Sequence, residues 1–335
     1  MSEFEDPQVT ILRLVENNFR VVLDSGGLAS FKCAPENIDR ELLKNYDVTF
    51  TVSTPECNAR KLTLCGKTRV RDYAMKGVLT CQVKLKTSAD TPQTMRSKAT
   101  ESVLAVLQQN RRLPYQSIYN FYAMGAAAET HRAYDAAATT ELAPSSSSWA
   151  ELSSANYAKI WALDAVDHSK STSVLNQYGL MLFRFKIGLK AGELRNEARE
   201  QCLTSISIAF TGYGTAPGGN GLTLKIWNST TSAWGNTQTG TAGTDETLTI
   251  ALTSSLTDYV DANGYLWVLA RTTNPSDGGT PAVAYCDFIQ VTTQVNGIKF
   301  ADYRNFRNVD ETRVKPYVYK AEFTIVAWLY ESLTT

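Results

Sequence analysis

The chain has 335 residues, of which 43% are hydrophobic, and it carries 33 basic and 33 acidic residues. This length allows two domains, and this apolar share is ordinary for proteins that bury a core, so an intrinsically disordered chain is excluded. The balanced charge excludes a strongly basic nucleic-acid binder. The start MSEFEDPQVT is acidic and no run of 18 apolar residues occurs, so we expect no membrane association and a chain kept in a cytoplasm.

The charge is distributed unevenly along the chain. Residues 115–295 hold 10 basic and 15 acidic residues, which leaves 23 of the 33 basic and 18 of the 33 acidic residues for the two ends. This difference suggests that the two parts face different surroundings or face each other, although chance produces a difference of this size equally often.

The first module begins with a predicted helix. Asp6 is its expected N-cap, Pro7 suits its first turn, and apolar residues from Ile11 to Phe19 recur at helical spacing. Two strands are predicted next, over 46–54 (YDVTFTVST) and 77–86 (GVLTCQVKLK), because apolar and polar residues alternate along them. A second helix is predicted up to Pro114, with Asp90 or Thr91 as its cap.

Residues 115–177 are rich in Ala and Ser, and we interpret them as a linker or irregular lead-in rather than core. Beyond this segment, short strands are separated by turns such as GTAPGGNG and NPSDGG. Strands at this spacing without helices predict an antiparallel β-sandwich or jelly roll over 178–295. The predicted strands cover 179–188, 203–212, 221–228, 246–252, 264–271 and 281–291.

The last strand, VYKAEFTIVAWLYESL (318–333), alternates with Phe323, Ile325, Ala327 and Leu329 on one face. Two central strands alone make a marginal sheet, so we expect this strand to close the sheet that begins at residue 46. The predicted fold is α+β: a discontinuous domain of residues 1–114 plus 296–335, with a small antiparallel or mixed sheet and two helices, interrupted by the inserted sandwich.

The chemistry of a catalytic or metal site is not apparent. The cysteines form no C-x-x-C pair, so we expect buried free thiols. His131 and His168 fall in or near the Ala- and Ser-rich segment and are expected to be solvated. Asp287 lies within a predicted strand, where we expect it to face solvent, with Ca²⁺ binding as the alternative. No catalytic residue, metal or cofactor is predicted.

Aromatic residues suggest one binding function for the sandwich, because aromatic rings on a β-sandwich stack on sugar rings. Trp234 lies in an expected loop and is the best candidate for exposure, with Tyr213 and Tyr265 as further candidate glycan contacts. Trp227 and Trp267 lie in strands and are expected in the core.

The discontinuous module resembles the tail terminator, or tail-completion, proteins of long-tailed bacteriophages and related archaeal viruses. The resemblance rests on the order of DPQVTILRLVENNF, YDVTFTVST, GVLTCQVKLK, MRSKATESVLAVLQQN and YKAEFTIVAWLYES. The inserted sandwich departs from the simple family pattern and is similar to carbohydrate-binding-like modules of virion proteins. The stretch that suggests this is DANGYLWVLARTTNPSDGGTPAVAYCDFIQV.

The resemblance implies a non-enzymatic structural protein of the virion tail or neck, assembled in the host cytoplasm. Its implied partners are itself, as a homohexameric ring, the tail tube protein and the head-tail connector, with DNA passing a channel without sequence specificity. The implied subunit contacts are Val326, Trp328 and Tyr330, and the implied basic contacts are Lys67, Arg69, Arg71 and Lys76. The alternative function is a glycan-binding adhesin or decoration protein that binds carbohydrate through the sandwich.

Overall fold

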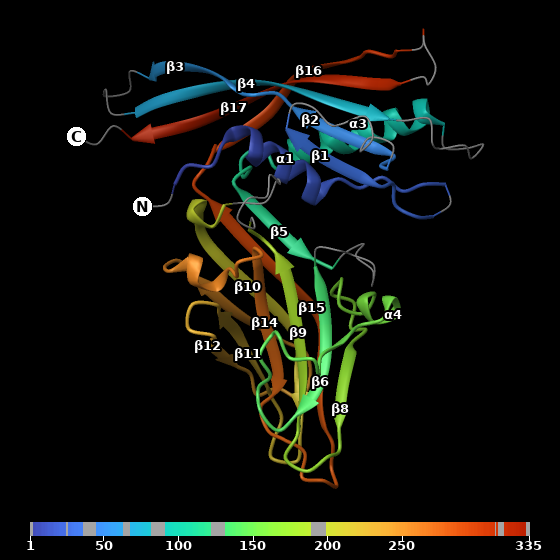
Figure 1. The fold of residues 1–335 in the computed structure, drawn as a ribbon, viewed down its shortest axis with the longest axis vertical. Coiled ribbons are helices and arrows are strands. Elements are labelled where there is room, and N and C mark those ends of the chain that lie inside the picture. Colours follow the sequence, from blue (N-terminus) through green and yellow to red (C-terminus); the bar gives the residue numbers. More distant parts are fainter. Residues whose placement is uncertain are drawn as a thin grey trace. The chain divides into compact units, whose positions relative to one another are not determined.

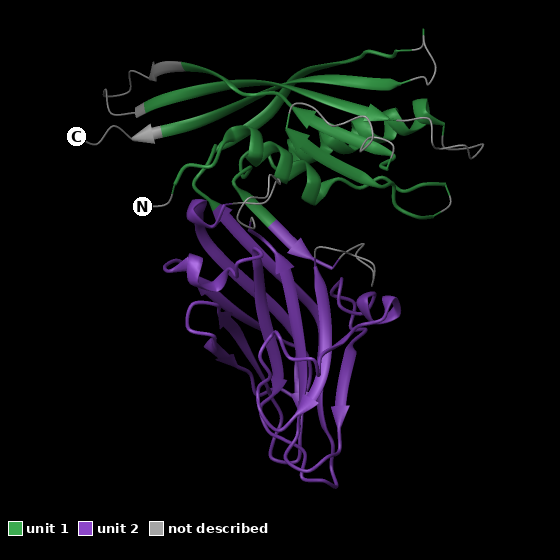
Figure 2. Cartoon of the chain, viewed as in Figure 1, with its two compact units in different colours: residues 1–117, 194–198, 295–335 green, residues 118–193, 199–294 purple. Residues whose placement is uncertain are grey.

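The computed structural model describes residues 3–24, 26–35, 45–62, 68–81, 91–121, 131–188, 199–311, 313 and 318–332. β-Strands make up most of the ordered structure (Figure 1). The chain forms two compact units (Figure 2): unit 1 contains residues 1–117, 194–198 and 295–335, and unit 2 contains residues 118–193 and 199–294. Unit 1 therefore takes its residues from both ends of the chain.

Unit 1 is a mixed sheet with two helices. The strand order is β1-β2-β4-β17-β16, and β3 pairs with β4 beyond the end of β2. The pair β1 and β2 is parallel, and the other ladders are antiparallel. The elements are α1 (Pro7–Asn18), β1 (Phe31–Pro35), β2 (Val48–Val52), β3 (Glu56–Leu62), β4 (Thr68–Cys81), α3 (Pro92–Gln109), β16 (Phe300–Asn308) and β17 (Tyr319–Ser332).

The two helices begin as their caps predict. Asp6 accepts a hydrogen bond from the Gln8 N–H, and Thr91 accepts one from the Thr94 N–H, and a proline occupies the first turn of each helix. Asp90, the other candidate cap, lies outside the described residues. Both helices lie on the same face of the sheet (Figure 1) and bury their apolar stripes against it.

The expectation that the last strand closes the first sheet is confirmed. β17 pairs with β4 along their full length, from Tyr319 opposite Cys81 to Ser332 opposite Thr68. β4 begins at Thr68, so the implied basic contacts Arg69, Arg71 and Lys76 all lie on a strand. Residues 82–86 of the predicted second strand lie outside the described part of the chain.

The core of unit 1 lies between the helices and the sheet. Phe50 and Phe323 meet edge to face with ring centroids 6.0 Å apart. Gly77 lies opposite Phe323 on β4, and a Cβ atom at this position would be 2.9 Å from the Phe50 ring and 3.1 Å from the Ile325 side chain. A glycine at this position leaves room for these two side chains.

A buried ion pair ties α1 to other parts of unit 1. The Arg13 guanidinium lies 2.5 Å from the Glu5 carboxylate, and the two side chains are 1% and 2% exposed. Arg13 also donates to the Ser117 hydroxyl, and the Thr10 hydroxyl donates to Glu5 at 2.6 Å. The Glu5 N–H donates to the Asn296 carbonyl, so this network links the start of the chain to both ends of the segment that forms unit 2.

Unit 2 is a β-sandwich, and the six predicted strands of residues 178–295 are confirmed. The first sheet has the order β13-β10-β15-β5, with β8 also paired to β15, and the second has the order β12-β11-β14-β9-β6-β7. Phe183 of the second sheet packs on Phe210 of the first, with ring centroids 6.0 Å apart. The elements are β5 (Gln116–Asn120), β6 (Arg132–Ala138), β7 (Ala150–Glu151), α4 (Ser154–Tyr157), β8 (His168–Thr172), β9 (Tyr178–Lys186), η1 (Glu200–Cys202), β10 (Leu203–Thr215), β11 (Leu222–Asn228), β12 (Ala233–Thr239), β13 (Glu246–Leu252), η2 (Leu256–Tyr259), β14 (Tyr265–Thr272) and β15 (Ala282–Val295).

The interpretation of residues 115–177 as a lead-in outside the core is wrong. They contribute β5, β6, β7 and β8 to the two sheets. Tyr157 and Ile160 are fully buried, and the Tyr157 hydroxyl accepts a hydrogen bond from the Ala133 N–H. The Ala- and Ser-rich composition of residues 115–177 resembled that of a linker, and residues 122–130 of this segment lie outside the described part of the chain.

Replacing Arg13 with Met should destabilise unit 1 by about 3–5 kcal/mol, because it leaves the Glu5 carboxylate buried without its cation. Scanning calorimetry of the full chain should show the transition of unit 1 at a lower temperature. The double variant Glu5→Gln/Arg13→Met should recover most of the loss, since no buried charge remains. A single-variant loss below about 1 kcal/mol would show that the pair is not required.

Candidate functional site

The face of the unit 1 sheet opposite the helices is the candidate site, and we call it the open face. Strand alternation places Val326, Trp328 and Tyr330 of β17 on it, because Ile325, Ala327 and Leu329 point into the core. Val326 and Trp328 are half-buried, and Tyr330 is 48% exposed. The three predicted subunit contacts therefore lie on one face.

A stacked aromatic pair forms the centre of the apolar part of the open face. Phe300 of β16 lies opposite Trp328, and their ring centroids are 4.2 Å apart with an interplanar angle of 14°. The Arg111 guanidinium lies 5.4 Å from the centre of the Phe300 ring. Sequence reasoning did not identify Phe300, because its pairing with Trp328 depends on the register of β16 and β17.

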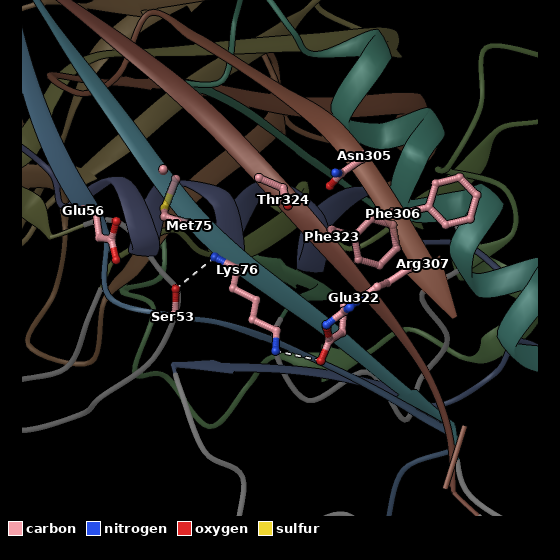
Figure 3. Close-up of a pocket in the computed structure, with 11 residues that line it drawn as sticks. Ser53, Glu56, Met75, Lys76, Asn305, Phe306, Arg307, Glu322, Phe323 and Thr324 are labelled. Atoms are coloured by element: carbon pink, nitrogen blue, oxygen red, sulfur yellow. Dashed lines mark hydrogen bonds and ion pairs between the residues drawn. The ribbon is translucent and has the colours of Figure 1, made fainter. Parts of the chain in front are cut away.

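A charged group lies farther along the same face. Glu322 accepts hydrogen bonds from Lys76 at 2.6 Å and from Arg307 at 2.7 Å, and these bonds hold the pKa of the Glu322 carboxyl below its ordinary value. These residues line a hollow of about 470 Å³, and Figure 3 shows Lys76, Glu322 and Arg307 pointing toward one another. Ser53 accepts a hydrogen bond from the Lys76 N–H at its rim.

The predicted basic contacts do not form one cluster. Alternation along β4 places Arg69 and Arg71 on the face that carries Tyr73 and Met75, whereas Lys76 is on the open face. Lys76 pairs with Glu322 of its own chain. Lys67 lies outside the described residues.

The three predicted glycan contacts are also separated. Trp234 belongs to β12 rather than a loop and is half-buried, with its indole N–H donating to the Leu142 carbonyl at 3.0 Å. Tyr265 lies in the same sheet, beneath the Arg184 guanidinium at 4.3 Å. Tyr213 lies in the other sheet and stacks on Tyr285 at 4.3 Å. The expected exposure of Trp234 is therefore wrong.

The two histidines are buried, which corrects the expectation that they are solvated. His131 is 5% exposed and accepts a hydrogen bond from the Lys186 N–H at 3.0 Å. Burial lowers the pKa of His131 to about 3, so the ring is neutral. His168 is 4% exposed and lies 3.2 Å from Asp135, which also accepts from Lys170 at 2.7 Å. Both histidine rings therefore contact other residues of unit 2.

Asp287 is 3% exposed, so the expectation that it faces solvent is wrong. It accepts a hydrogen bond from the Asp164 N–H at 3.3 Å. Burial, then the charges of Asp245, Asp287 and Asp164, raise the pKa of Asp167 to about 6. No group of three or more His, Cys, Asp or Glu side chains in the described ranges is arranged to hold a metal ion.

The thiols follow the sequence expectation in part. Cys33, Cys81, Cys202 and Cys286 are buried and form no disulfide, as predicted, whereas Cys57 on β3 is exposed. Cys65 lies outside the described residues. None of the helices that the structure describes is long and apolar enough to cross a membrane.

Replacing Asp167 with Asn should remove a pH dependence from the stability of unit 2. The raised pKa means that the folded state binds more protons than the unfolded state between about pH 4 and pH 6, so the free energy of unfolding falls as the pH rises through this range. The variant should be more stable than the wild type by about 1 kcal/mol above pH 6, after allowance for the partial exposure of Asp167.

Urea unfolding at about pH 4.5 and about pH 7.5 tests this difference. Tryptophan fluorescence is a suitable signal, because five of the six tryptophans belong to unit 2. Parallel pH profiles for the wild type and the variant would contradict the role given to Asp167.

The sequence matches no curated protein. Solved structures with some similarity include one titled "Family 16 Carbohydrate Binding Module-2", at 13% identity and a TM-score of 0.22 over 35% of this chain and 76% of that chain. Another is the bacteriophage CBA120 tailspike protein 4, at 6% identity and a TM-score of 0.24 over 54% of this chain and 19% of that chain. Winged bean acidic lectin matches at 9% identity and a TM-score of 0.26 over 54% of this chain and 99% of that chain. Similarities at these TM-scores support no argument about fold or function.

One family model matches the sequence. It covers residues 128–295, half of the 335-residue chain, and its description is "Uncharacterized protein, C-terminal domain". The matched region begins within unit 2 and ends at its boundary with unit 1. The chain therefore belongs to the family AF_1625_C through the β-sandwich that unit 2 forms.

Proposed function

We propose that the protein is a structural virion protein of the tail-completion type. In this proposal, unit 1 assembles into a homohexameric ring that caps the tail tube and joins it to the head connector. The observation that carries the proposal is the open face of the unit 1 sheet, which presents Val326, Trp328 and Tyr330 beside Phe300. Unit 2 is a separate module of the same subunit.

The composition of the open face supports subunit association. Aromatic and aliphatic side chains lie together there, although a solvated sheet face normally carries polar residues. Tyr330 is 48% exposed, and Trp328 is only partly covered by Phe300. Burial of these rings against another protein surface removes apolar area from water, at about 25 cal/mol per Å².

The edges of the sheet support a ring rather than a two-fold dimer. β16 is an edge strand, and its residues 304–308 are exposed, so their backbone groups are accessible to a neighbouring chain. The other edge is formed by β1 and β3. A contact between two different edges is heterologous, and it gives a ring when the rotation between neighbouring subunits closes and an open filament when it does not.

The positions of Arg69 and Arg71 are consistent with further partners. They lie on the opposite face of β4 from the aromatic residues. In the proposed ring, one sheet face contacts a neighbouring subunit, and the two arginines are directed toward the tail tube, the connector, or the DNA that passes the channel. Contacts to DNA phosphates of this kind carry no sequence specificity.

We also infer that unit 2 is a jelly roll. The inference is supported by the strand orders β8-β15-β10-β13 and β9-β14-β11-β12, because in a jelly roll the chain alternates between two four-stranded sheets in this way. β5, β6 and β7 are additions to this arrangement.

Replacing Tyr330 with Asp should dissociate the ring, because it places a charge in the centre of an apolar contact. We expect the wild type to behave as a hexamer in light scattering, and the variant to associate at least about tenfold more weakly. Trp328→Asp should act in the same direction, with thermal unfolding used to confirm that the variant folds.

Leu163→Asp is the matched control, since Leu163 is 65% exposed in unit 2 and should not affect association. A wild-type protein that stays monomeric at every accessible concentration, and makes no contact with tail tubes, would refute the ring. A hexamer that tolerates both β17 variants would instead show that the subunits meet through another surface.

A further inference from the structure

The outer face of the second sheet of unit 2 has a covered half and an uncovered half. Leu180, Leu269 and Ala136 lie on it and are buried, because Leu142 and Trp149 pack over them. These covering residues belong to the segment 139–149, which we call the strap. Beyond the strap, Trp227, Trp267 and Tyr265 lie on the same face and remain half-buried.

Strand register arranges the uncovered side chains in a row across the sheet. Trp234 of β12 lies opposite Trp227 of β11. Ile226 of β11 lies opposite Val268 of β14 in an antiparallel ladder, so the next residues along these strands, Trp227 and Trp267, are neighbours. Trp267 lies opposite Arg184. The row therefore runs across four neighbouring strands, which are spaced about 4.8 Å apart.

Edge-to-face contacts between rings and one hydrogen bond hold the aromatic side chains of this row in place. Trp227 and Trp234 meet at 70° with centroids 5.0 Å apart, and Tyr265 and Trp267 meet at 68° with centroids 6.0 Å apart. The Trp267 indole N–H donates to Asp261 at 2.8 Å. Edge-to-face packing of this kind fixes the ring orientations before any ligand arrives, which lowers the entropy cost of binding.

We propose that this row binds a neutral oligosaccharide that lies across the strands, with the rings of Trp227 and Trp267 as its contacts, because Arg184 already covers the Tyr265 ring at 4.3 Å. One face of a sugar ring presents C–H groups, which pack against the negative face of an aromatic ring, while its hydroxyl groups bond to polar atoms at the rim. Asp261 and the exposed Asn236, which donates to the Tyr259 hydroxyl at 2.6 Å, supply such atoms.

The charges around the row select a neutral ligand. Arg132 pairs with Glu151 at 2.9 Å, and Arg184 lies over the rings of Tyr265 and Trp267. Lys186 also lies over the Tyr265 ring, at 5.1 Å, and donates to the Asn263 carbonyl. Because each of these cations already has a partner within the chain, this surface offers little free charge to a nucleic acid or a charged polymer.

The small number of uncovered side chains in the row favours a chain-like ligand over a folded protein. The strap borders the row, and it is fixed by Glu141, which pairs with Lys225 at 2.6 Å and Arg271 at 2.8 Å, and by the hydrogen bond from Trp234 to Leu142. A stable protein interface involves about 20–30 residues on each partner, whereas the uncovered row consists of a few aromatic side chains beside the strap. A linear sugar chain needs only a strip of this kind.

Binding of the full-length protein to a printed array of cello-, manno-, xylo- and galacto-oligosaccharides tests the proposal, followed by calorimetric titration of a soluble oligosaccharide that binds. Trp227→Ala and Trp267→Ala should each weaken binding at least about tenfold. Tyr213→Ala is the matched control, since Tyr213 lies on the other sheet and should leave binding unchanged.

Trp267→Ala also removes the donor to Asp261, so thermal unfolding must show that this variant folds, and Trp227→Ala provides an independent test. A wild-type protein that binds no sugar of the array, or sugar binding that survives both tryptophan substitutions, overturns the proposal. The proposal does not depend on the ring, because these substitutions lie in unit 2 and should leave the oligomeric state unchanged.

Discussion

The ladder between β4 and β17 is the constraint on which the rest of unit 1 depends. It joins residues 68–81 to residues 319–332, so two segments from opposite ends of the chain form the central strands of one sheet. The register also decides which side chains share a face: it places Trp328 beside Asp72 and Val326 beside Ala74. A shift of one residue would exchange the core face of β17 with the open face, and the burial of Phe323 and Ile325 opposes that shift.

The pairing of β5 with β15 explains how a second unit is accommodated within the chain. β5 and β15, through which the chain passes into unit 2 and out of it, are neighbouring strands, and the Val295 N–H donates to the Tyr115 carbonyl at 3.0 Å. The two ends of the insert are therefore held together as the ends of a short surface loop would be. The entropy of closing a loop grows only slowly with its length, so unit 1 folds around a large insert at a modest additional cost.

Local alternation and capping predicted the parts of the fold that are decided within a few residues. The helix starting at Pro7 and the core face of β17 follow from such patterns, and both are confirmed. The first half of β4 was missed because Arg69, Arg71 and Lys76 interrupt the apolar alternation that marks a strand. β3, with the sequence ECNARKL, shows no such alternation and was missed as well.

Positions decided by distant partners were beyond prediction from the sequence. The burial of His131 depends on the Lys186 N–H, and that of Asp287 on the Asp164 N–H. The pairing of Phe300 with Trp328 depends on the β16–β17 register, which includes an irregularity between Tyr303 and Asn305. In the candidate site, the sequence pattern identified which residues of β17 share a face, whereas only the assembled sheet shows that Lys76 is paired with Glu322 and separated from Arg69.

The two units differ in how the outer face of their aromatic-bearing sheet is covered. Each has a sheet with one face against its own core and aromatic side chains on the other face. In unit 2 the strap covers part of that outer face, and the aromatic rings that remain form a narrow row with satisfied charges, which suits a thin ligand. In unit 1 the helices pack on one face only, and Tyr330 and Trp328 extend the aromatic surface away from the charged group around Glu322. A broad surface of this kind gains most from contact with another folded protein, because the free energy of apolar burial scales with the area removed from water.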